Sequence, residues 1–255
     1  VHGMTVPGSI EAAQRARGLN KGLFEWLRKA PWGNPAFAGM FMSLVFFGFI
    51  GGISGVVMGT EQINLIMHNT LYVPGHFHGT VVAGTTLAFM AITYYLVPLV
   101  FRRELRFMKL AKLQPYLFGI GAAGISVFMM GAGTLGVSRR HWDMQFADAV
   151  LPFDYPSAAF LMMGLNGMFA VLAAVGGVAF IVVVVASVFF GRKLETDEKP
   201  SYPEVPPQAA VVAEHGSAES LKIPGTTMLV AIFFISFVLY YFVNWKYLSE
   251  VWPLS

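Results

Sequence analysis

Two histidines separated by one residue, in the run Gly75-His76-Phe77-His78, are the feature of this chain best suited to chemistry. They lie near the start of an almost charge-free stretch, residues 71–100, which indicates a membrane helix. Side chains two positions apart on an α-helix point about 200° apart, so these imidazoles cannot share one metal. Ionisable groups inside a bilayer are costly and usually functional. One imidazole on each face therefore suits two separate metals, for which haem iron is the natural candidate. The alternative is a pair of interfacial histidines hydrogen-bonded to neighbouring helices.

A second polar pair, Arg139-Arg140, follows a later apolar stretch. A planar guanidinium can pair with a carboxylate through two hydrogen bonds, so these arginines could hold the propionates of a haem near the membrane surface. The alternative is that they simply anchor the protein in the lipid headgroups. The two interpretations differ in whether the arginines lie beside the histidines.

The short segment before the histidine helix contains His68 and Asn69. A histidine can take up a proton near neutral pH, although a lone loop histidine is usually only solvated. Asn69 is a residue type that commonly caps the start of a helix, here the helix expected from residue 71. His68 becomes a candidate site residue only if it lies beside a haem.

Composition places the chain in a membrane. Of its 255 residues, 56% are hydrophobic and only 12% are charged, whereas soluble domains carry about 25% charged residues. The formal net charge of +3 is too small to argue for nucleic acid as a partner. The absence of cysteine excludes Cys-ligated iron–sulfur clusters, thiolate copper sites and Cys-x-x-Cys-His haem attachment within this chain.

Five apolar stretches are long enough to cross a bilayer, which predicts an all-α membrane bundle. They are residues 35–59, 71–100, 114–137, 157–190 and 226–244. We expect a basic segment at 1–34, a four-helix region at 35–190, a polar, proline-containing linker at 191–225 and a final helix with its C-terminus at 226–255. Lys and Arg concentrate in 1–34 and in the loop after the second span, so the N-terminus is expected to be cytoplasmic and the C-terminus outside.

This alternating topology has a consequence for the candidate residues. It places His68, the His76/His78 pair and the Arg139/Arg140 pair at the same outer edge of the membrane. Three unusual features at one level support a common site better than any one alone.

At this point the chain resembles a known family. The run His68-Asn69-Thr70-Leu71-Tyr72-Val73-Pro74-Gly75-His76-Phe77-His78 looks like the region between the ninth and tenth helices of haem-copper oxidase subunit I. The resemblance is closest to the B family, in which an Asn follows the loop histidine. Residues 51–55 resemble the glycine-rich ninth helix, and residues 138–140 the arginine pair that binds propionates. The fifth span is similar to the extra thirteenth helix of B-family members.

The resemblance implies a role for each candidate. His76 would be the axial ligand of the high-spin, oxygen-binding haem and thus the catalytic residue, and His78 would be one of two ligands of the low-spin haem. Arg139 and Arg140 would bind propionates, with His68 and the following Asn69 beside them on the proton-exit side. Where the family commonly has an aspartate four residues before the loop histidine, this chain has Asn64.

The resemblance also implies what must come from elsewhere. The chain has six histidines, and only His76 and His78 lie inside an expected span. Copper would therefore belong to the complex without being ligated by this chain. The remaining subunit I helices, in a separate chain or a missing segment, would supply its ligands. Further expected partners are a copper-containing subunit II, a small electron donor such as cytochrome c, and membrane lipid.

The implied function is that of a terminal respiratory oxidase in the cell inner (cytoplasmic) membrane, reducing dioxygen to water with proton translocation. Two alternatives are a nitric oxide reductase of the same superfamily and a haem-free membrane transporter or assembly subunit. Typical nitric oxide reductases carry His-Gly-His, so Phe77 favours an oxidase.

Overall fold

The computed structural model describes residues 2–140, 155–196, 198 and 223–251. In these residues, five helices are long and apolar enough to cross a membrane. They are Pro35–Gly59, Tyr72–Val100, Met108–Thr134, Ser157–Phe190 and Pro224–Val243. The predicted helical membrane bundle is therefore confirmed. Most of the expected linker at 191–225 and the end of the chain lie outside the described residues, as do His141 and His215.

The first span consists of α3 (Pro35–Phe46), η1 (Phe47–Gly52) and α4 (Ile53–Gly59). Asn34 caps its start by accepting hydrogen bonds from the backbone N–H groups of Ala36 and Phe37, at 2.9 and 3.1 Å. Pro35 occupies the first helical position, where its missing N–H costs nothing. A short helix, α5 (Glu61–Met67), then leads towards the second span.

The second span contains the histidines and comprises α6 (Tyr72–Phe77), η2 (His78–Thr86) and α7 (Leu87–Val100). The third, α8 (Met108–Thr134), begins before the predicted residue 114 and ends before the predicted residue 137. Its first turns contain Lys109 and Lys112, whose long side chains can reach past the apolar layer while the backbone stays helical. The helix therefore begins several residues before the apolar stretch does.

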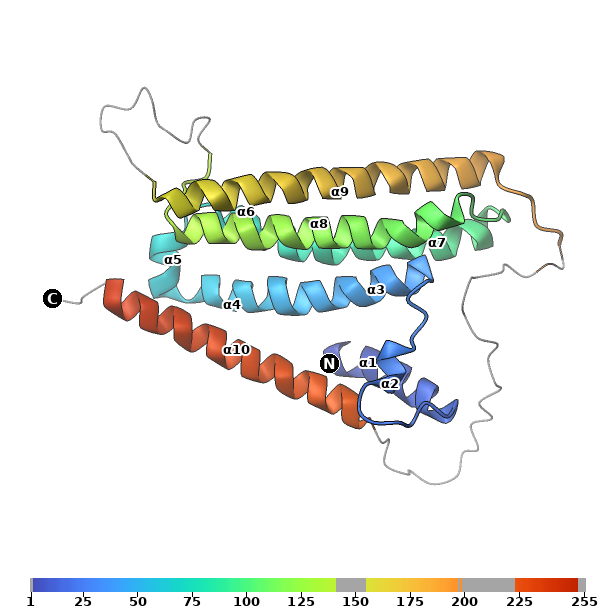
Figure 1. The fold of residues 1–255 in the computed structure, drawn as a ribbon, viewed down its shortest axis with the longest axis horizontal. Coiled ribbons are helices and arrows are strands. Elements are labelled where there is room, and N and C mark those ends of the chain that lie inside the picture. The colour runs from blue at the N-terminus through green and yellow to red at the C-terminus, as the bar shows by residue number, and fades with distance from the viewer. Residues whose placement is uncertain (1, 141–154, 197, 199–222, 252–255) are drawn as a thin grey trace.

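The fourth span, α9 (Ser157–Phe190), lies against α8 along most of its length (Figure 1). Glycines of both helices bring the backbones together. A Cβ atom on Gly121 of α8 would lie 2.5 Å from the backbone nitrogen of Ala173. A Cβ atom on Gly176 of α9 would likewise lie 2.5 Å from the backbone nitrogen of Phe118. Close approach through small residues is the usual way in which membrane helices pack.

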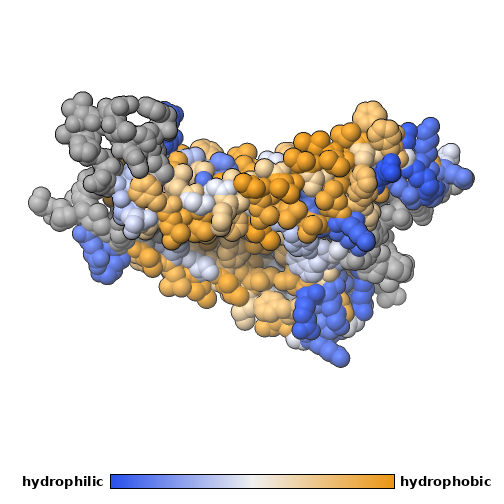
Figure 2. Space-filling view, turned by 45° about the horizontal axis from the view of Figure 1, so that its top comes forward, coloured by the Kyte–Doolittle hydropathy of each residue, from blue (hydrophilic) through white to orange (hydrophobic). Residues whose placement is uncertain are grey.

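Two isolated β-bridges tie the loops together at opposite ends of the bundle (Figure 1). Thr70 pairs with Ser138, which joins the loops after the first and third spans. Arg103 pairs with Lys193, which joins the segments after the second and fourth spans. The loops after successive spans thus lie at alternate ends of the bundle, as the sequence predicted. Figure 2 shows the corresponding surface, with apolar residues across the middle and hydrophilic ones towards the ends.

The fifth span is the first part of α10 (Pro224–Val251), which lies at the edge of the bundle (Figure 1). The expected basic segment 1–34 contains α1 (His2–Ala16) and α2 (Glu25–Arg28), and α1 contacts the start of α10. The fully buried carboxylate of Glu11 accepts hydrogen bonds from the backbone N–H groups of Gly225 and Thr226, at 2.9 and 2.6 Å. Arg15 Nε donates to the same carboxylate at 2.7 Å.

Candidate functional site

The histidine pair lies where the second span changes its helical winding. α6 ends at Phe77, and the π-helical stretch η2 begins at His78. The first span contains its own π-helical stretch, η1, and the two stretches pack against each other. A Cβ atom on Gly51 would lie only 2.5 Å from Thr80 Cγ2. The two spans therefore approach so closely here that only a glycine fits. π-helical stretches in proteins occur frequently at functional sites.

His76 is half-buried and faces the first span. Its Nδ1 lies 2.9 Å from the hydroxyl oxygen of Ser54 on α4. Beside Ser54, Gly55 leaves space for the imidazole: a Cβ atom there would lie only 3.0 Å from His76 Cε1. The ring therefore lies against the first span, beside the Ser54 hydroxyl and in the space that Gly55 leaves.

His78 is also half-buried but is held by its own helix. Its Nδ1 lies 2.7 Å from the carbonyl oxygen of Pro74. Because a carbonyl only accepts hydrogen bonds, Nδ1 carries the proton and Nε2 retains its lone pair. Neutral histidines that ligate metals usually donate their other ring N–H to such an acceptor. The ring is thus in the tautomer that a metal ligand requires.

The two imidazoles have different anchors on different elements, which fits two ligands better than one shared site. Phe77, between them in the sequence, is 52% exposed. Within the described residues, no three His, Cys, Asp or Glu side chains come together as a metal site.

The loop containing Arg139 runs beside the segment that leads into the histidine helix. The backbone N–H of Arg139 donates to the carbonyl oxygen of Asn69 at 2.8 Å, and that of Leu71 donates to Val137 at 2.8 Å. The structure therefore brings Asn69 and Arg139 together, at the end of the bundle where the topology predicted His68 and the arginine pair. Arg140 is exposed and has a φ of 68°, in the left-handed region. His68 is exposed at the end of α5, where its backbone N–H donates to Asn64 at 2.8 Å.

Arg139 provides a test of whether this loop suits a haem. Among the described residues, its Nε atom is buried and has no hydrogen-bond partner. A buried donor of a charged group without an acceptor is costly, and a carboxylate is its strongest partner. The side chain thus fits the expectation of a propionate at this position.

The prediction that Asn69 caps the next helix is wrong. The helix begins at Tyr72, and the hydroxyl of Thr70 accepts the hydrogen bond from the Tyr72 N–H at 3.2 Å. The N-cap position is Leu71, which makes no side-chain capping hydrogen bond, and Asn69 lies two residues before it.

Sequence reasoning missed two residues around the site. Ser54 contacts His76 across the two spans, and Tyr72 forms a 3.1 Å hydrogen bond between its hydroxyl and that of Tyr240 on α10. The sequence marks Ser54 as a hydroxyl inside an apolar span, 22 positions before His76, and as a member of the glycine-rich run 51–55. Nothing in the sequence pairs Tyr72 with Tyr240, 168 positions later.

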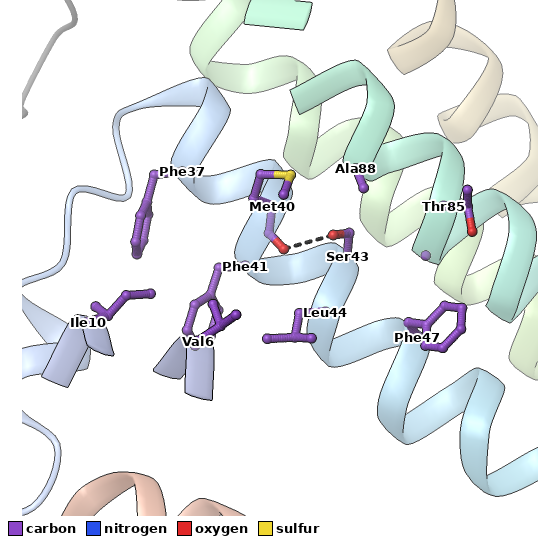
Figure 3. Close-up of a pocket in the computed structure, with 11 residues that line it drawn as sticks. Val6, Ile10, Phe37, Met40, Phe41, Ser43, Leu44, Phe47, Thr85 and Ala88 are labelled. Atoms are coloured by element: carbon purple, nitrogen blue, oxygen red, sulfur yellow. Dashed lines mark hydrogen bonds between the residues drawn. The ribbon is translucent and has the colours of Figure 1, made fainter. Parts of the chain in front are cut away.

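An apolar cavity of about 330 Å³ lies away from the histidines, between α1 and the first two spans. Figure 3 shows Val6 and Ile10 of α1 facing Phe37, Phe41 and Leu44 of α3. The one side-chain hydrogen bond drawn there is donated by Ser43 to its own helix, at the carbonyl of Met40. The lining offers packing surface but no group for acid–base or metal chemistry.

At the opposite end of the bundle, charged groups hold the described segments together. Arg192 forms an ion pair with Glu104 at 2.6 Å and another with Glu198. The hydrogen bonds from Arg192 lower the pKa of both carboxyl groups below the ordinary value. Arg102 donates to the backbone carbonyls of Glu195, Thr196 and Glu198. These contacts fasten the two segments joined by the Arg103–Lys193 bridge.

Comparison with known proteins gives one consistent result. Residues 3–165 match the family model described as cytochrome c and quinol oxidase polypeptide I. The chain is 36% identical over 217 residues to cytochrome c oxidase subunit 1 of Thermus thermophilus, covering 82% of this chain and 35% of the relative. It is 35% identical over 102 residues to cytochrome c oxidase polypeptide 1 of Halobacterium salinarum, covering 39% of this chain and 17% of that relative.

The fold gives the same result. A cryo-EM structure of a heme-copper terminal oxidase dimer superimposes with a TM-score of 0.63 at 28% identity. The alignment covers 89% of this chain and 39% of that one. The chain thus spans little more than a third of the length of that structure and of the Thermus relative.

Proposed function

Because this chain belongs to the cytochrome c and quinol oxidase polypeptide I family, the haem-copper oxidase subunit I family, we propose that it supplies one axial histidine to each of two haems in a terminal respiratory oxidase. The observation that carries the proposal is the separate anchoring of His76 and His78, with Arg139 and its unpartnered buried Nε in the loop beside their helix. Bound haem would supply the one-electron and dioxygen chemistry, and the protein would supply ligation, orientation and electrostatics.

Each histidine has its own role in this proposal. His76 ligates the high-spin haem at which dioxygen reacts, and His78 ligates the low-spin haem that relays electrons. The Nδ1 of His78 is occupied by the carbonyl of Pro74, so Nε2 is its ligand atom. Because the two rings have different anchors, a change at one leaves the orientation of the other intact.

Arg139 and Arg140 bind the haem propionates. Arg139 would satisfy its buried Nε by donating to a carboxylate, and the exposed Arg140 would add positive charge at the surface. His68, exposed in the neighbouring loop, would exchange protons with water near a propionate. Asn69 would contribute its backbone carbonyl, which holds the Arg139 loop in place.

Other parts of the complex complete the site at which dioxygen reacts. Copper, its ligands and the second ligand of the low-spin haem come from the remaining subunit I helices, in a partner chain or a further segment. A copper-containing subunit II passes electrons from a small donor such as cytochrome c. The assembly reduces dioxygen to water and translocates protons across the cell inner membrane. The chain resembles the B family, with its N-terminus in the cytoplasm and its C-terminus outside.

The alternatives are less well supported. Family membership favours a haem-bearing role over a transporter or assembly subunit. The oxidase names of the relatives, together with Phe77 between the histidines, favour dioxygen over nitric oxide as the substrate.

The test is optical spectroscopy of the purified membrane complex that contains this chain. Reduced-minus-oxidised and carbon monoxide difference spectra should reveal two haem populations, of which only one binds carbon monoxide. An intact complex without haem absorption would refute the proposal.

A further inference from the structure

We infer that Ser126 of the third span is a positioning residue, which holds the turn that carries His76 and His78 in α-helical winding. The inference rests on the proposed function, in which the two histidines ligate different haems. The Ser126 hydroxyl bonds to the backbone of the histidine helix rather than to an imidazole, so it acts on both ligands through that backbone.

The Ser126 hydroxyl donates its hydrogen bond to a helix other than its own. The residue is fully buried, and its Oγ lies 2.6 Å from the carbonyl oxygen of Gly75. A hydroxyl inside a helix commonly bonds to a carbonyl of the preceding turn, as Ser43 and Thr134 do here. The Gly75 carbonyl belongs to the peptide unit whose nitrogen is that of His76. The bond therefore fixes the backbone immediately before the first histidine.

Glycines bring the third span close enough for this bond. A Cβ atom on Gly75 would lie 2.7 Å from the backbone nitrogen of Met130. A Cβ atom on Gly79, one turn later, would lie 2.9 Å from the hydroxyl oxygen of Ser126. Small residues of this kind let membrane helices approach backbone to backbone. The histidine turn thus lies directly against α8.

Other polar contacts between these two spans lie further along the helices. Gln114 of α8 accepts a hydrogen bond from the Tyr94 hydroxyl and donates one to Met90, nearer the opposite end of the bundle. At the histidine turn, within the described residues, Ser126 makes the side-chain hydrogen bond that joins the third span to the second. Loss of its hydroxyl would leave that turn without a polar tie to α8.

The bond to Gly75 lies just before the winding of the histidine helix changes. α6 ends at Phe77, and η2 begins at His78. The backbone N–H of His78 still donates to the carbonyls of Pro74 and Gly75. Beyond it, π winding joins residues five apart instead of four, so backbone donors and carbonyls are paired differently on the two sides of the boundary. Gly75 thus supplies one of the last carbonyls of the α-helical turn.

Hydroxyl groups reinforce this boundary from two sides. Three successive carbonyls accept a side-chain hydrogen bond, that of Gly75 from Ser126 and the next two from Thr80, at 3.3 Å each. Thr80 belongs to the histidine helix and moves with it. Ser126 belongs to a neighbouring helix, and its bond is the shortest of the three at 2.6 Å. It is therefore the contact that fixes the boundary relative to the rest of the bundle.

The position of the boundary determines the angle between the two imidazoles. In α winding, side chains two positions apart point about 200° apart. A π turn contains more residues, so each residue advances the helix by a smaller angle. If the boundary moved to a point before His76, the angle between His76 and His78 would decrease, and both rings would turn relative to their haems. By holding the Gly75 carbonyl, Ser126 keeps both histidines on the α-helical side.

The matched experiment compares Ser126→Ala with Ser43→Ala in the whole complex. Each change removes one buried hydroxyl that donates to a carbonyl, at 2.6 and 2.7 Å, but Ser43 donates to Met40 of its own helix. The first readout is the iron–histidine stretching band of the high-spin haem, from resonance Raman spectra of the reduced complex. The second is the set of electron paramagnetic resonance g-values of the low-spin haem in the oxidised complex. Absorption spectra give the haem content of the same samples.

Ser126→Ala should shift both the iron–histidine band and the low-spin g-values, because both imidazoles turn relative to their haems. Ser43→Ala should leave both signals in place. If Ser126→Ala does not assemble, Ser126→Cys replaces it. A thiol is a weaker donor than a hydroxyl, so this variant should shift both signals in the same direction by a smaller amount.

Three results would overturn the inference while leaving the ligand roles of the histidines intact. They are a lower haem content with both signals unshifted, a shift at one haem only, and equal shifts in the two serine variants. A complex of unaltered sequence without a carbon monoxide-binding haem would instead refute the proposed function. The two failures are therefore distinguishable.

Discussion

At the scale of single residues, the two histidines differ in what their orientation depends on. His78 needs only its own helix, because Pro74 lies one turn earlier on it. His76 lies against the first span, beside the hydroxyl of Ser54 and in the space left by the absent side chain of Gly55. Substitutions on the first span should therefore affect one haem and spare the other.

Gly55→Ala tests this dependence sterically. The new methyl group would lie 3.0 Å from His76 Cε1 and should displace the ring, at a cost of about 1–3 kcal/mol for overpacking. We expect reduced occupancy of the carbon monoxide-binding haem, with the low-spin absorption unchanged. Gly59→Ala on the same helix is the control, since a methyl group there meets nothing within 4 Å. Equal spectra for the two variants would refute the steric role of Gly55.

Arg139 and Arg140 should differ in their influence on a haem. Arg139 has the buried, unpartnered Nε, whereas Arg140 is exposed to solvent, which screens its charge. Arg139→Gln should lower the reduction potential of the haem whose propionate it holds, because a positive charge that favours the reduced state is lost. The loss corresponds to about 1.5–3 kcal/mol, the contribution of a hydrogen bond to a charged group.

The measurement is a spectroscopic redox titration of both variants. Arg140→Gln should change the potential less than Arg139→Gln. A larger effect at Arg140, or none at either arginine, would contradict the assignment of Arg139 to a propionate.

At the scale of elements, the apolar stretches predicted the spans because a helix of about 20 apolar residues has the length needed to cross the hydrocarbon core of a bilayer. The first and fourth spans have the predicted bounds, Pro35–Gly59 and Ser157–Phe190. The third differs because Lys109 and Lys112 continue the helix beyond its apolar part. The π-helical stretches were not predictable, since a run of six to nine apolar or small residues has no periodicity that separates π from α winding.

The candidate site was predictable in part. Sequence alone proposed His76, His78 and the arginines as candidates, and alternation of the spans predicted that His68 and Arg139 would lie at one end. The contact between Ser54 and His76 was not predictable, because the sequence does not say which face of the first span meets the histidine helix. That Asn69 does not cap the histidine helix was likewise not predictable, because the residue types do not fix the start of that helix at Tyr72.

The contact between α1 and α10 gives a prediction at the same scale. Burial raises the pKa of Glu11, but the hydrogen bonds from Thr226, Arg15 and Gly225 outweigh it, so the pKa is lowered from the ordinary value of 4.5. The ionised carboxylate therefore stabilises this contact fully above a pH of about 4.5, the ordinary pKa. The stabilisation is lost as the pH falls through the lowered pKa. Glu11→Ala should remove it at every pH.

Hydrogen–deuterium exchange of the Gly225 and Thr226 amides measures this contact. Loss of a hydrogen bond to a buried charge, about 1.5–3 kcal/mol, should speed their exchange about 10-fold or more. Glu25→Ala is the control, because Glu25 binds Lys29 and the backbone of Lys21 within the N-terminal segment. Unchanged protection in the Glu11 variant would show that α10 is held in place by other contacts.

At the scale of the whole molecule, the loops at the two ends fix the order of the spans. The bridge at Thr70 and Ser138 belongs to the end that carries the arginine pair, and the bridge at Arg103 and Lys193 to the end held by Arg192. The histidine helix is thereby fixed at both ends while its middle packs on the first and third spans. Such a frame suits a subunit whose task is to hold two cofactors in fixed positions.

The central claim is that His76 and His78 ligate different haems, and the most direct measurement is the difference spectrum of the purified complex with each histidine replaced in turn. His76→Ala should abolish carbon monoxide binding and leave the low-spin absorption. His78→Ala should abolish the low-spin absorption and leave carbon monoxide binding. Identical spectral changes in the two variants, or no change in either, would contradict the account.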